Sequence, residues 1–267
     1  MNTVVAPAPL RVVQITDCHL GDQPGVPLLN IDTDRSLGAV LELIRRQQPD
    51  CDLLLATGDL SDNGSVAAYQ RLQDYTRDFA EARWLPGNHD SAAVLQETLR
   101  GTACLQRCFV GAHWQVILLD SGVPGEVGGY LSTGELEALR QCLETAPQRH
   151  ALICVHHPVF DVGCAWLDIQ RVGNADEFWG LIAAFPQVKA VLCGHVHQPS
   201  DQNVRGVRTL TTPSTAWQFA AGSPDFRVDN LAPGYRWLDL HADGRIETGI
   251  ERVAADMFYA DVDSDGY

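Results

Sequence analysis

The chain has 267 residues, of which 45% are hydrophobic and 20% are charged, and its formal net charge is −15 at pH 7. This composition is typical of a globular protein with a sizeable core, and the acidic balance argues against a nucleic-acid polymer or an anionic membrane surface as partner. No apolar run approaches the roughly 20 residues of a membrane-spanning helix, and the first residues lack the basic start and long apolar stretch of a secretory signal.

The eight cysteines are interpreted as free thiols. Cys154 and Cys193 lie inside apolar, strand-like runs, where cysteine behaves as a small buried hydrophobic residue. A disulfide framework is typical of short secreted chains, and this chain is long and shows no export signal. We therefore expect reduced cysteines and a cytoplasmic location.

The N-terminal half alternates strand-like and helical patterns. Strands are predicted at 11–16, 51–57 and 82–86. Apolar residues at helical spacing predict a helix around 37–44, which Pro49 ends, and a second helix over 66–79. Polar residues follow each strand at once, as Asp17-Cys18-His19, Gly58-Asp59 and Gly87-Asn88-His89-Asp90.

The same pattern continues towards the C-terminus. Strands are predicted at 114–119, 151–155 and 188–193, and the last two end in His156-His157-Pro158 and Gly194-His195-Val196-His197. Ser132 and Glu135 have the spacing of a capping box, which predicts a helix start, and a further helix is expected over 176–185. The Asp243-Gly244 turn predicts a β-hairpin. Because no linker is visible, we expect one domain over 1–267, with flexible ends at 1–9 and 260–267.

Five predicted strands therefore end in carboxylate, imidazole or amide side chains. Strand–helix alternation predicts a mostly parallel sheet, in which these ends share the edge where α/β folds bind ligands. Ionisable groups concentrated there need a neutralising charge, and such ligands without thiolates suit first-row transition metals such as Fe, Mn or Zn. The candidate ligands are Asp17, His19, Asp59, Asn88, His156, His195 and His197. A single catalytic ion takes about three protein ligands, so seven candidates indicate two ions, with Asp59 as the shared ligand.

These motifs, in this order, resemble the signature of the calcineurin-like metallophosphoesterases. The resemblance implies an α/β fold of two packed mixed β-sheets flanked by helices, a four-layer αββα sandwich with the metals at one end. It also implies a catalytic His89 that acts on the phosphate or the leaving oxygen and is oriented by Asp90. Of the neighbours His156 and His157, which point opposite ways on a strand, the family pattern selects His156 as the ligand. One ion would take Asp17, His19 and His197, the other Asn88, His156 and His195, with Asp59 between them.

A narrower resemblance extends over nearly the whole chain. The segments QITDCHL, ATGDL, WLPGNHD, GCAWLD and TPSTAWQF are similar to those of bacterial class III 3′,5′-cyclic-AMP phosphodiesterases. This implies hydrolysis of cyclic AMP to 5′-AMP by in-line attack of a metal-bridging hydroxide, with His89 assisting the departing 3′-oxygen. Trp166, Trp217 and Phe219 are expected on loops where the base could stack. The other expected substrate contacts are His19, Asp59, Asn88, His89 and His197.

Some alternatives stay open at the level of sequence. The same metal ligands would serve a metallophosphoesterase acting on 2′,3′-cyclic nucleotides, glycerophosphodiesters or phosphomonoesters. A metal-binding scaffold without turnover is a third hypothesis, which the full ligand set disfavours. Hydrolysis of cyclic GMP and the oligomeric state are not defined by the sequence.

Two further residue groups are interpreted from their surroundings. Asp62, Asn63 and Gly64 are predicted to form a turn and a helix cap and not to bind metal. Cys18 lies between two candidate ligands, and we expect it to matter little to metal binding, although a thiol there could make the site sensitive to oxidation.

Overall fold

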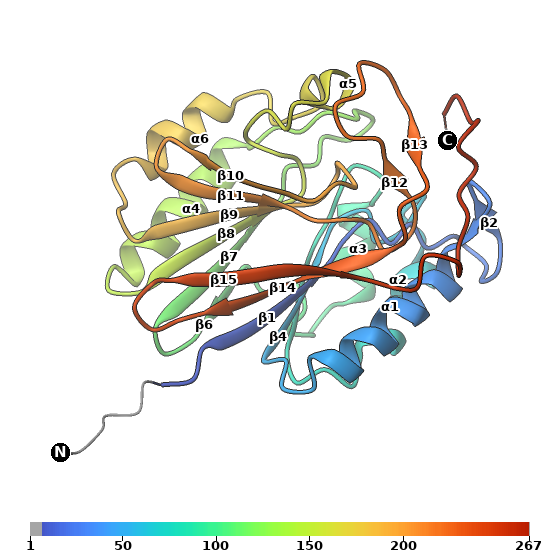
Figure 1. The fold of residues 1–267 in the computed structure, drawn as a ribbon. Helices are drawn as coiled ribbons and strands as arrows, with labels where there is room; N and C mark the ends of the chain where they lie inside the picture. Colours follow the sequence, from blue (N-terminus) through green and yellow to red (C-terminus); the bar gives the residue numbers. More distant parts are fainter. Residues whose placement is uncertain (1–6, 267) are drawn as a thin grey trace.

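The computed structural model describes residues 7–266, in which two β-sheets pack face to face between layers of helices (Figure 1). In the first sheet the strands are ordered β15 (Ile246–Arg252), β14 (Gly234–Leu240), β1 (Leu10–Ile15), β4 (Leu53–Thr57) and β5 (Ala82–Leu85). In the second the order is β10 (Ser200–Val204), β11 (Val207–Thr211), β9 (Val188–Cys193), β8 (His150–Val155), β7 (Trp114–Leu119) and β6 (Cys108–Val110).

Both sheets are mixed, as the family resemblance implied. The strands β1, β4 and β5 run parallel, and so do β7, β8, β9 and β11. The antiparallel strands β14, β15, β10 and β6 extend these parallel centres. The parallel order brings the carboxyl ends of β1, β4 and β5 to one edge of their sheet, and those of β8 and β9 to one edge of theirs.

Strand β4 shows how the layers are held together. Leu53 and Leu55 point towards the other sheet and pack in the core between the sheets, which includes Leu152. Leu54 and Ala56 point the opposite way, into the core beneath the first helical layer. A strand buried on both faces reads as a continuous apolar run, which is why the sequence over 51–57 lacks polar alternation.

Helices cover the two outer faces. Figure 1 shows α1 (Thr33–Gln47) and α2 (Val66–Thr76) against the first sheet, and α4 (Thr133–Thr145) and α6 (Ala175–Ile182) against the second. Two shorter helices, α3 (Ala92–Thr98) and α5 (Ala165–Asp168), belong to connections. Two further strand pairs join β2 (Pro27–Leu28) to β3 (Ile31–Asp32) and β12 (Gln218–Phe219) to β13 (Val228–Asp229).

Two predicted helix caps differ from the structure. The Ser132 hydroxyl accepts a hydrogen bond from the Glu135 N–H at 3.1 Å, as a capping box requires. The Glu135 carboxylate, however, bonds to Arg107 and to the Asp120 N–H, so the reciprocal half of the box was wrong. Helix α2 is capped by Ser65 and not by the preceding Asp62-Asn63-Gly64, because the Ser65 hydroxyl accepts from the Ala68 N–H.

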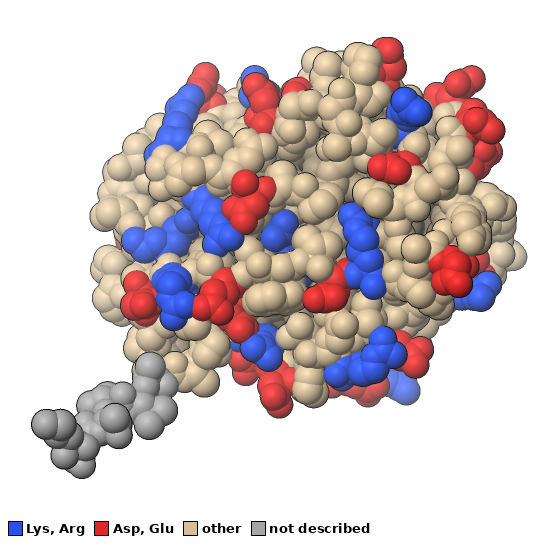
Figure 2. All heavy atoms as spheres, in the orientation of Figure 1, with Lys and Arg blue, Asp and Glu red and all other residues tan. Residues whose placement is uncertain are grey.

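The expected flexible ends fall partly on residues 1–6 and 267, which lie outside the described part of the chain, and this expectation stays a prediction. Within the described part, Asp261 N–H donates to the Leu29 carbonyl oxygen and the Asn30 amide donates to that of Tyr259. No helix among the described residues is long and apolar enough to cross a membrane. On the face that Figure 2 shows, basic side chains are interspersed with acidic ones.

Leu152→Ala removes a fully buried side chain from the core between the sheets and tests the packing that joins them. We expect the free energy of unfolding to fall by about 2–5 kcal/mol, because a cavity is left between two sheets that cannot close over it. Urea denaturation measures the loss. Val110→Ala, at an exposed position on β6, serves as the control and should change stability by less than about 0.5 kcal/mol.

Candidate metal centre

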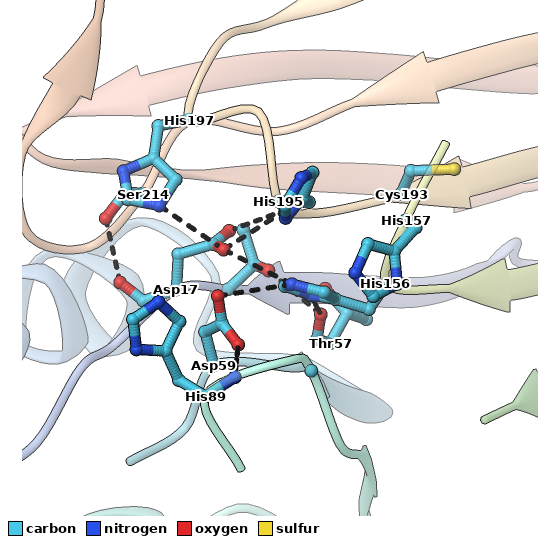
Figure 3. A network of polar contacts seen from close by, with 12 residues as sticks. Asp17, Thr57, Asp59, His89, His156, His157, Cys193, His195, His197 and Ser214 are labelled. Atoms are coloured by element: carbon cyan, nitrogen blue, oxygen red, sulfur yellow. Dashed lines mark hydrogen bonds and ion pairs between the residues drawn. The ribbon is translucent and has the colours of Figure 1, made fainter. Parts of the chain in front are cut away.

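The candidate ligands meet at the carboxyl ends of strands from both sheets. Asp17 and His19 follow β1, Asp59 follows β4 and Asn88 follows β5, while the histidines follow β8 and β9. Figure 3 shows the side chains of Asp17, Asp59, His156 and His197 directed towards one shared space. The site is thus divided between the two sheets, although the sequence pattern alone placed it at the edge of one.

The backbone at these positions is unusual. The five residues Asp17, His19, Asp59, His195 and His197 have φ angles between 45° and 66°, the left-handed region that non-glycine residues avoid. The glycines of the motifs permit the close approach of the loops: a Cβ atom at Gly87 would collide with Asp59 Oδ1, and one at Gly194 with Thr16 Oγ1. The motif glycines are therefore needed for packing, and the ligand residues are held in strained conformations by their surroundings.

One group of donor atoms belongs to Asp17, His19 and His197, which lie within 4.8 Å of one another. Nε2 of His197 is 3.4 Å from Asp17 Oδ1 and 3.4 Å from His19 Nε2. The opposite nitrogens are held elsewhere, since His197 Nδ1 donates to the Trp217 carbonyl oxygen and His19 Nδ1 is 3.6 Å from Asp62 Oδ1. Each imidazole therefore directs Nε2 into the shared space, as metal-binding histidines do.

A second group of donor atoms includes His156 and His195, and Asn88 lines the same cavity as His195. His156 Nδ1 donates to the Thr57 carbonyl oxygen at 2.8 Å, which leaves Nε2 facing Asp59 Oδ2 at 3.2 Å. His195 Nε2 bonds to Gln170 Oε1 at 3.0 Å, so Nδ1 is its free ligand atom. Among the described residues, Asn88 Oδ1 is buried without a hydrogen-bond partner, which is costly unless a cation binds it.

His157 also lies within 4.8 Å of His156 and His195, but both of its ring nitrogens are engaged. Nδ1 is 2.8 Å from the Ser121 hydroxyl and Nε2 is 3.0 Å from the Val127 carbonyl oxygen. Burial, reinforced by His156, lowers the pKa of His157 to about 3, so this imidazole is neutral. The geometry thus favours His156 over His157 as the metal ligand.

The electrostatics of the site call for added positive charge. Burial acts to raise the pKa of Asp59, but His156 and the other imidazoles outweigh it and hold that pKa well below its usual value. Burial acts to lower the pKa of His156, and Asp59 outweighs it and raises that pKa to about 9. Burial, reinforced by the neighbouring imidazoles of His157 and His156, keeps the pKa of His195 well below its usual value. Buried carboxylates and imidazoles, with nitrogen and oxygen donors and no thiolate, fit transition-metal ions.

Cys18 is not a reactive thiol. Its side chain is fully buried, and burial raises its pKa to about 12. Oxidation requires an accessible thiolate, which this residue does not provide. The expectation that Cys18 could make the site sensitive to oxidation is therefore corrected.

The partner of His89 is Asp62 and not Asp90. His89 Nδ1 bonds to the Asp62 carbonyl oxygen at 3.0 Å and is 3.6 Å from Asp62 Oδ1, which also faces His19. The His89 N–H donates to Asp59 Oδ1 at 2.9 Å. In the sequence, Asp62 lies three residues after the candidate ligand Asp59, on the same loop. This proximity could have indicated a role at the site, but Asp62 was interpreted only as a turn residue.

Asp90 holds the ligand loops together. Its carboxylate accepts hydrogen bonds from the N–H groups of Leu60, Ser61 and Gly87 and from the Tyr69 hydroxyl. Burial, followed by the nearby Asp59, raises the pKa of Asp90 to about 6. The predicted catalytic role of Asp90 in orienting His89 is thus wrong, since this carboxylate ties the loop after β5 to the loop after β4.

The three aromatic residues expected on loops have different surroundings. Trp217 is only 1% exposed, and its ring lies 4.6 Å from that of His19 and 5.4 Å from that of His197. Phe219 belongs to β12 and stacks on His197 at 4.3 Å, while Trp166 belongs to helix α5. Trp217 therefore has no open face for a base, and its role is to support two ligand imidazoles.

Comparison with known proteins agrees with this geometry. The family model for calcineurin-like phosphoesterases matches residues 10–199. The 3′,5′-cyclic adenosine monophosphate phosphodiesterase CpdA of Pseudomonas aeruginosa is 42% identical over 100% of this chain and 98% of its own. The protein of that name from Escherichia coli K12 is 44% identical over 97% and 96%. A crystal structure of a dimetal phosphatase from Danio rerio is 16% identical, with a TM-score of 0.61 over 93% of this chain and 100% of that one. These matches agree with the strand ends, donor groups and sheet order described above. The chain therefore belongs to the calcineurin-like phosphoesterase family, which uses a dinuclear metal site.

Proposed function

We propose that this protein hydrolyses 3′,5′-cyclic AMP to 5′-AMP at a centre of two metal ions. The observation that carries the proposal is a set of overlapping donor groups, with Asn88 and His89 lining the adjacent cavity; the groups contain Asp17, His19, Asp59, His156, His195 and His197. The names and near full-length similarity of the two bacterial relatives support cyclic AMP as the substrate. A cytoplasmic location is part of the proposal, since reduced cysteines are stable there.

The proposal assigns Asp17, His19 and His197 to one ion and Asn88, His156 and His195 to the other. Asp59 is the shared ligand, because its Oδ2 is 3.8 Å from His19 Nε2 and 3.2 Å from His156 Nε2. Fe, Mn and Zn all suit these donors. Two bound ions neutralise the phosphodiester charge and generate a nucleophile from water near neutral pH.

His89 is the residue proposed to assist the leaving group. Its side chain is 25% exposed, in contrast to the buried ligands, so a substrate can reach it. Nδ1 is 3.0 Å from the Asp62 carbonyl oxygen, and the proposal assigns Nε2 to donate a hydrogen bond or a proton to the departing 3′-oxygen. The Asp62 carboxylate, whose Oδ1 is 3.6 Å from Nδ1 of His89, helps to orient the ring.

The first test is hydrolysis of cyclic AMP by the purified, metal-loaded protein in water enriched in oxygen-18. We expect 5′-AMP carrying one labelled oxygen, with activity lost on chelation and restored by Mn or Fe, because water supplies the new oxygen. Mass spectrometry and metal analysis of the same sample provide both readouts. If two ions are bound but cyclic AMP stays intact, the substrate is another phosphodiester. If the protein binds no metal and is inactive, the hypothesis of a scaffold without turnover is favoured.

A second test compares His156→Ala with His157→Asn. We expect His156→Ala to lose at least one of the two ions, because Nε2 of His156 is a proposed ligand. His157→Asn should keep both ions and be less stable, because it loses hydrogen bonds to Ser121 and Val127. Metal content after gel filtration and the melting temperature separate the two effects. The reverse result for metal content would refute the ligand assignment.

A third test separates leaving-group assistance from metal binding. We expect His89→Ala to lower kcat for cyclic AMP by roughly 10²–10⁴-fold with metal content unchanged, because proton donation to the 3′-oxygen is lost. Asp62→Asn should lower kcat less. Bis(p-nitrophenyl) phosphate, whose leaving group departs as an anion, should be affected little by either change. An equal loss on both substrates would show that His89 does not act on the leaving oxygen.

A further inference from the structure

A cavity of about 380 Å³ opens beside the metal centre. Its lining includes Asn88, His89 and His195, which belong to the metal centre, and the aromatic residues Trp166, Phe219 and Phe226. We propose that this cavity is the nucleobase subsite and that Trp166 and Phe226 are the residues on which the base stacks. The inference rests on the proposed function, because it assigns a place to the part of a cyclic nucleotide that the metals do not hold.

The aromatic residues form one connected cluster. The Trp166 ring lies 4.9 Å from that of Phe219 and 5.3 Å from that of Phe226, both in edge-to-face geometry. Phe219 and Phe226 are 5.6 Å apart. Because Phe219 also stacks on the ligand His197, the rings make a continuous connection from the metal centre to the far wall of the cavity. Such packing fixes the rings before a ligand arrives, which lowers the entropy cost of binding.

The rings differ in what they can offer to a ligand. Phe219 is only 3% exposed and one of its faces is covered by His197, so it supports the wall. Trp166 and Phe226 are partly exposed and line the cavity. Planar bases bind to aromatic faces by stacking, which is the interaction that these two residues can supply. Phe226 was not singled out by the sequence, because the fold alone brings it to this wall.

The size and charge of the cavity suit a neutral base. Pockets for small ligands measure roughly 300–1,000 Å³, and about 380 Å³ lies within this range. Asp265 contributes a carboxylate to the lining, and none of the described lining residues is Lys or Arg. A second phosphate would be repelled there, whereas an uncharged base would not. Since Asn88, His89 and His195 belong both to the metal centre and to the cavity lining, a nucleotide whose phosphate is at the metals can extend into this space.

A second cavity on the other side of Asn88 is the alternative. It measures about 460 Å³ and is lined by the loop from Pro86 to Ala93 and by residues from Asp120 to Gly125. None of its described lining residues is aromatic, so it offers no stacking surface. The aromatic cavity is therefore the better fit for a base.

The test uses the full-length, metal-loaded protein with Trp166→Ala and Phe226→Ala. The readouts are kcat and KM for cyclic AMP and the inhibition constants of 5′-AMP and inorganic phosphate. We expect KM and the inhibition constant of 5′-AMP to rise roughly 5- to 100-fold, as for loss of one base–aromatic stack. The inhibition constant of phosphate, which probes the metals alone, should not change. Trp166→Phe should recover most of the affinity, because it keeps a ring.

Ile169→Ala is the matched control, since Ile169 lies directly after α5, is 83% exposed and does not line the cavity. Melting temperatures identify any variant that fails to fold, and Trp166→Leu and Phe226→Leu then replace the alanine variants. Unchanged affinity for 5′-AMP in the aromatic variants would overturn the subsite, as would an equal weakening of phosphate. Failure of the proposed function is instead visible in the wild-type protein, as hydrolysis of bis(p-nitrophenyl) phosphate without hydrolysis of cyclic AMP.

Discussion

The left-handed backbone of the ligand residues is the constraint on which the rest of this structure depends. A non-glycine residue in that region costs of the order of 1–3 kcal/mol, and Asp17, Asp59 and His195 are among the residues held there. Hydrogen bonds between the loops keep them in place, since Asp17 N–H donates to the Gly58 carbonyl oxygen and His19 N–H to that of Asp59. The conformation turns each side chain back over the strand end from which it comes. Without it, the carboxylates and imidazoles would follow their strands outwards instead of facing one another.

A buried polar layer beneath the site connects the two sheets. Gln14 on β1 donates to the Thr57 hydroxyl on β4 and to the carbonyl oxygen of Cys193 on β9. The Thr57 carbonyl oxygen in turn accepts from His156, which follows a strand of the second sheet. The side-chain amide of Gln14 is hydrogen-bonded through both its nitrogen and its oxygen, and it lies in a region of low dielectric, where such networks fix geometry strongly. The relative position of the two halves of the site is thus determined by polar contacts as well as by apolar packing.

Most strands of the two sheets, and the candidate ligands at their ends, could be predicted from the sequence because both leave local signals. Buried strands such as β8 and β9 appear as apolar runs that end abruptly, and the residues after them carry the predicted metal-binding pattern. The strands β6, β10 and β11 were not predicted, because β6 is short and β10 alternates polar residues at an exposed edge. The direction in which a loop side chain points could not be predicted from the sequence. Asp62 and Asp90 have the same chemistry and lie equally near ligands in sequence, and only the fold decides that Asp62 contacts His89 and Asp90 contacts backbone amides. Trp217 was misinterpreted for the same reason, since an aromatic residue near a site can face the substrate or the ligands.

The division of the ligands between the sheets has a consequence for the stability of the folded chain. The strands of the first sheet lead into Asp17, His19, Asp59 and Asn88, and those of the second lead into His156, His195 and His197. Ions bound by these residues would therefore link the two sheets. Their binding free energy would add to the free energy of unfolding by mass action. When the metal is scarce, the mutual repulsion of the buried carboxylates is no longer balanced, and the open end of the sandwich becomes its weakest point. We therefore expect the stability of the folded chain, as well as its activity, to depend on the supply of metal.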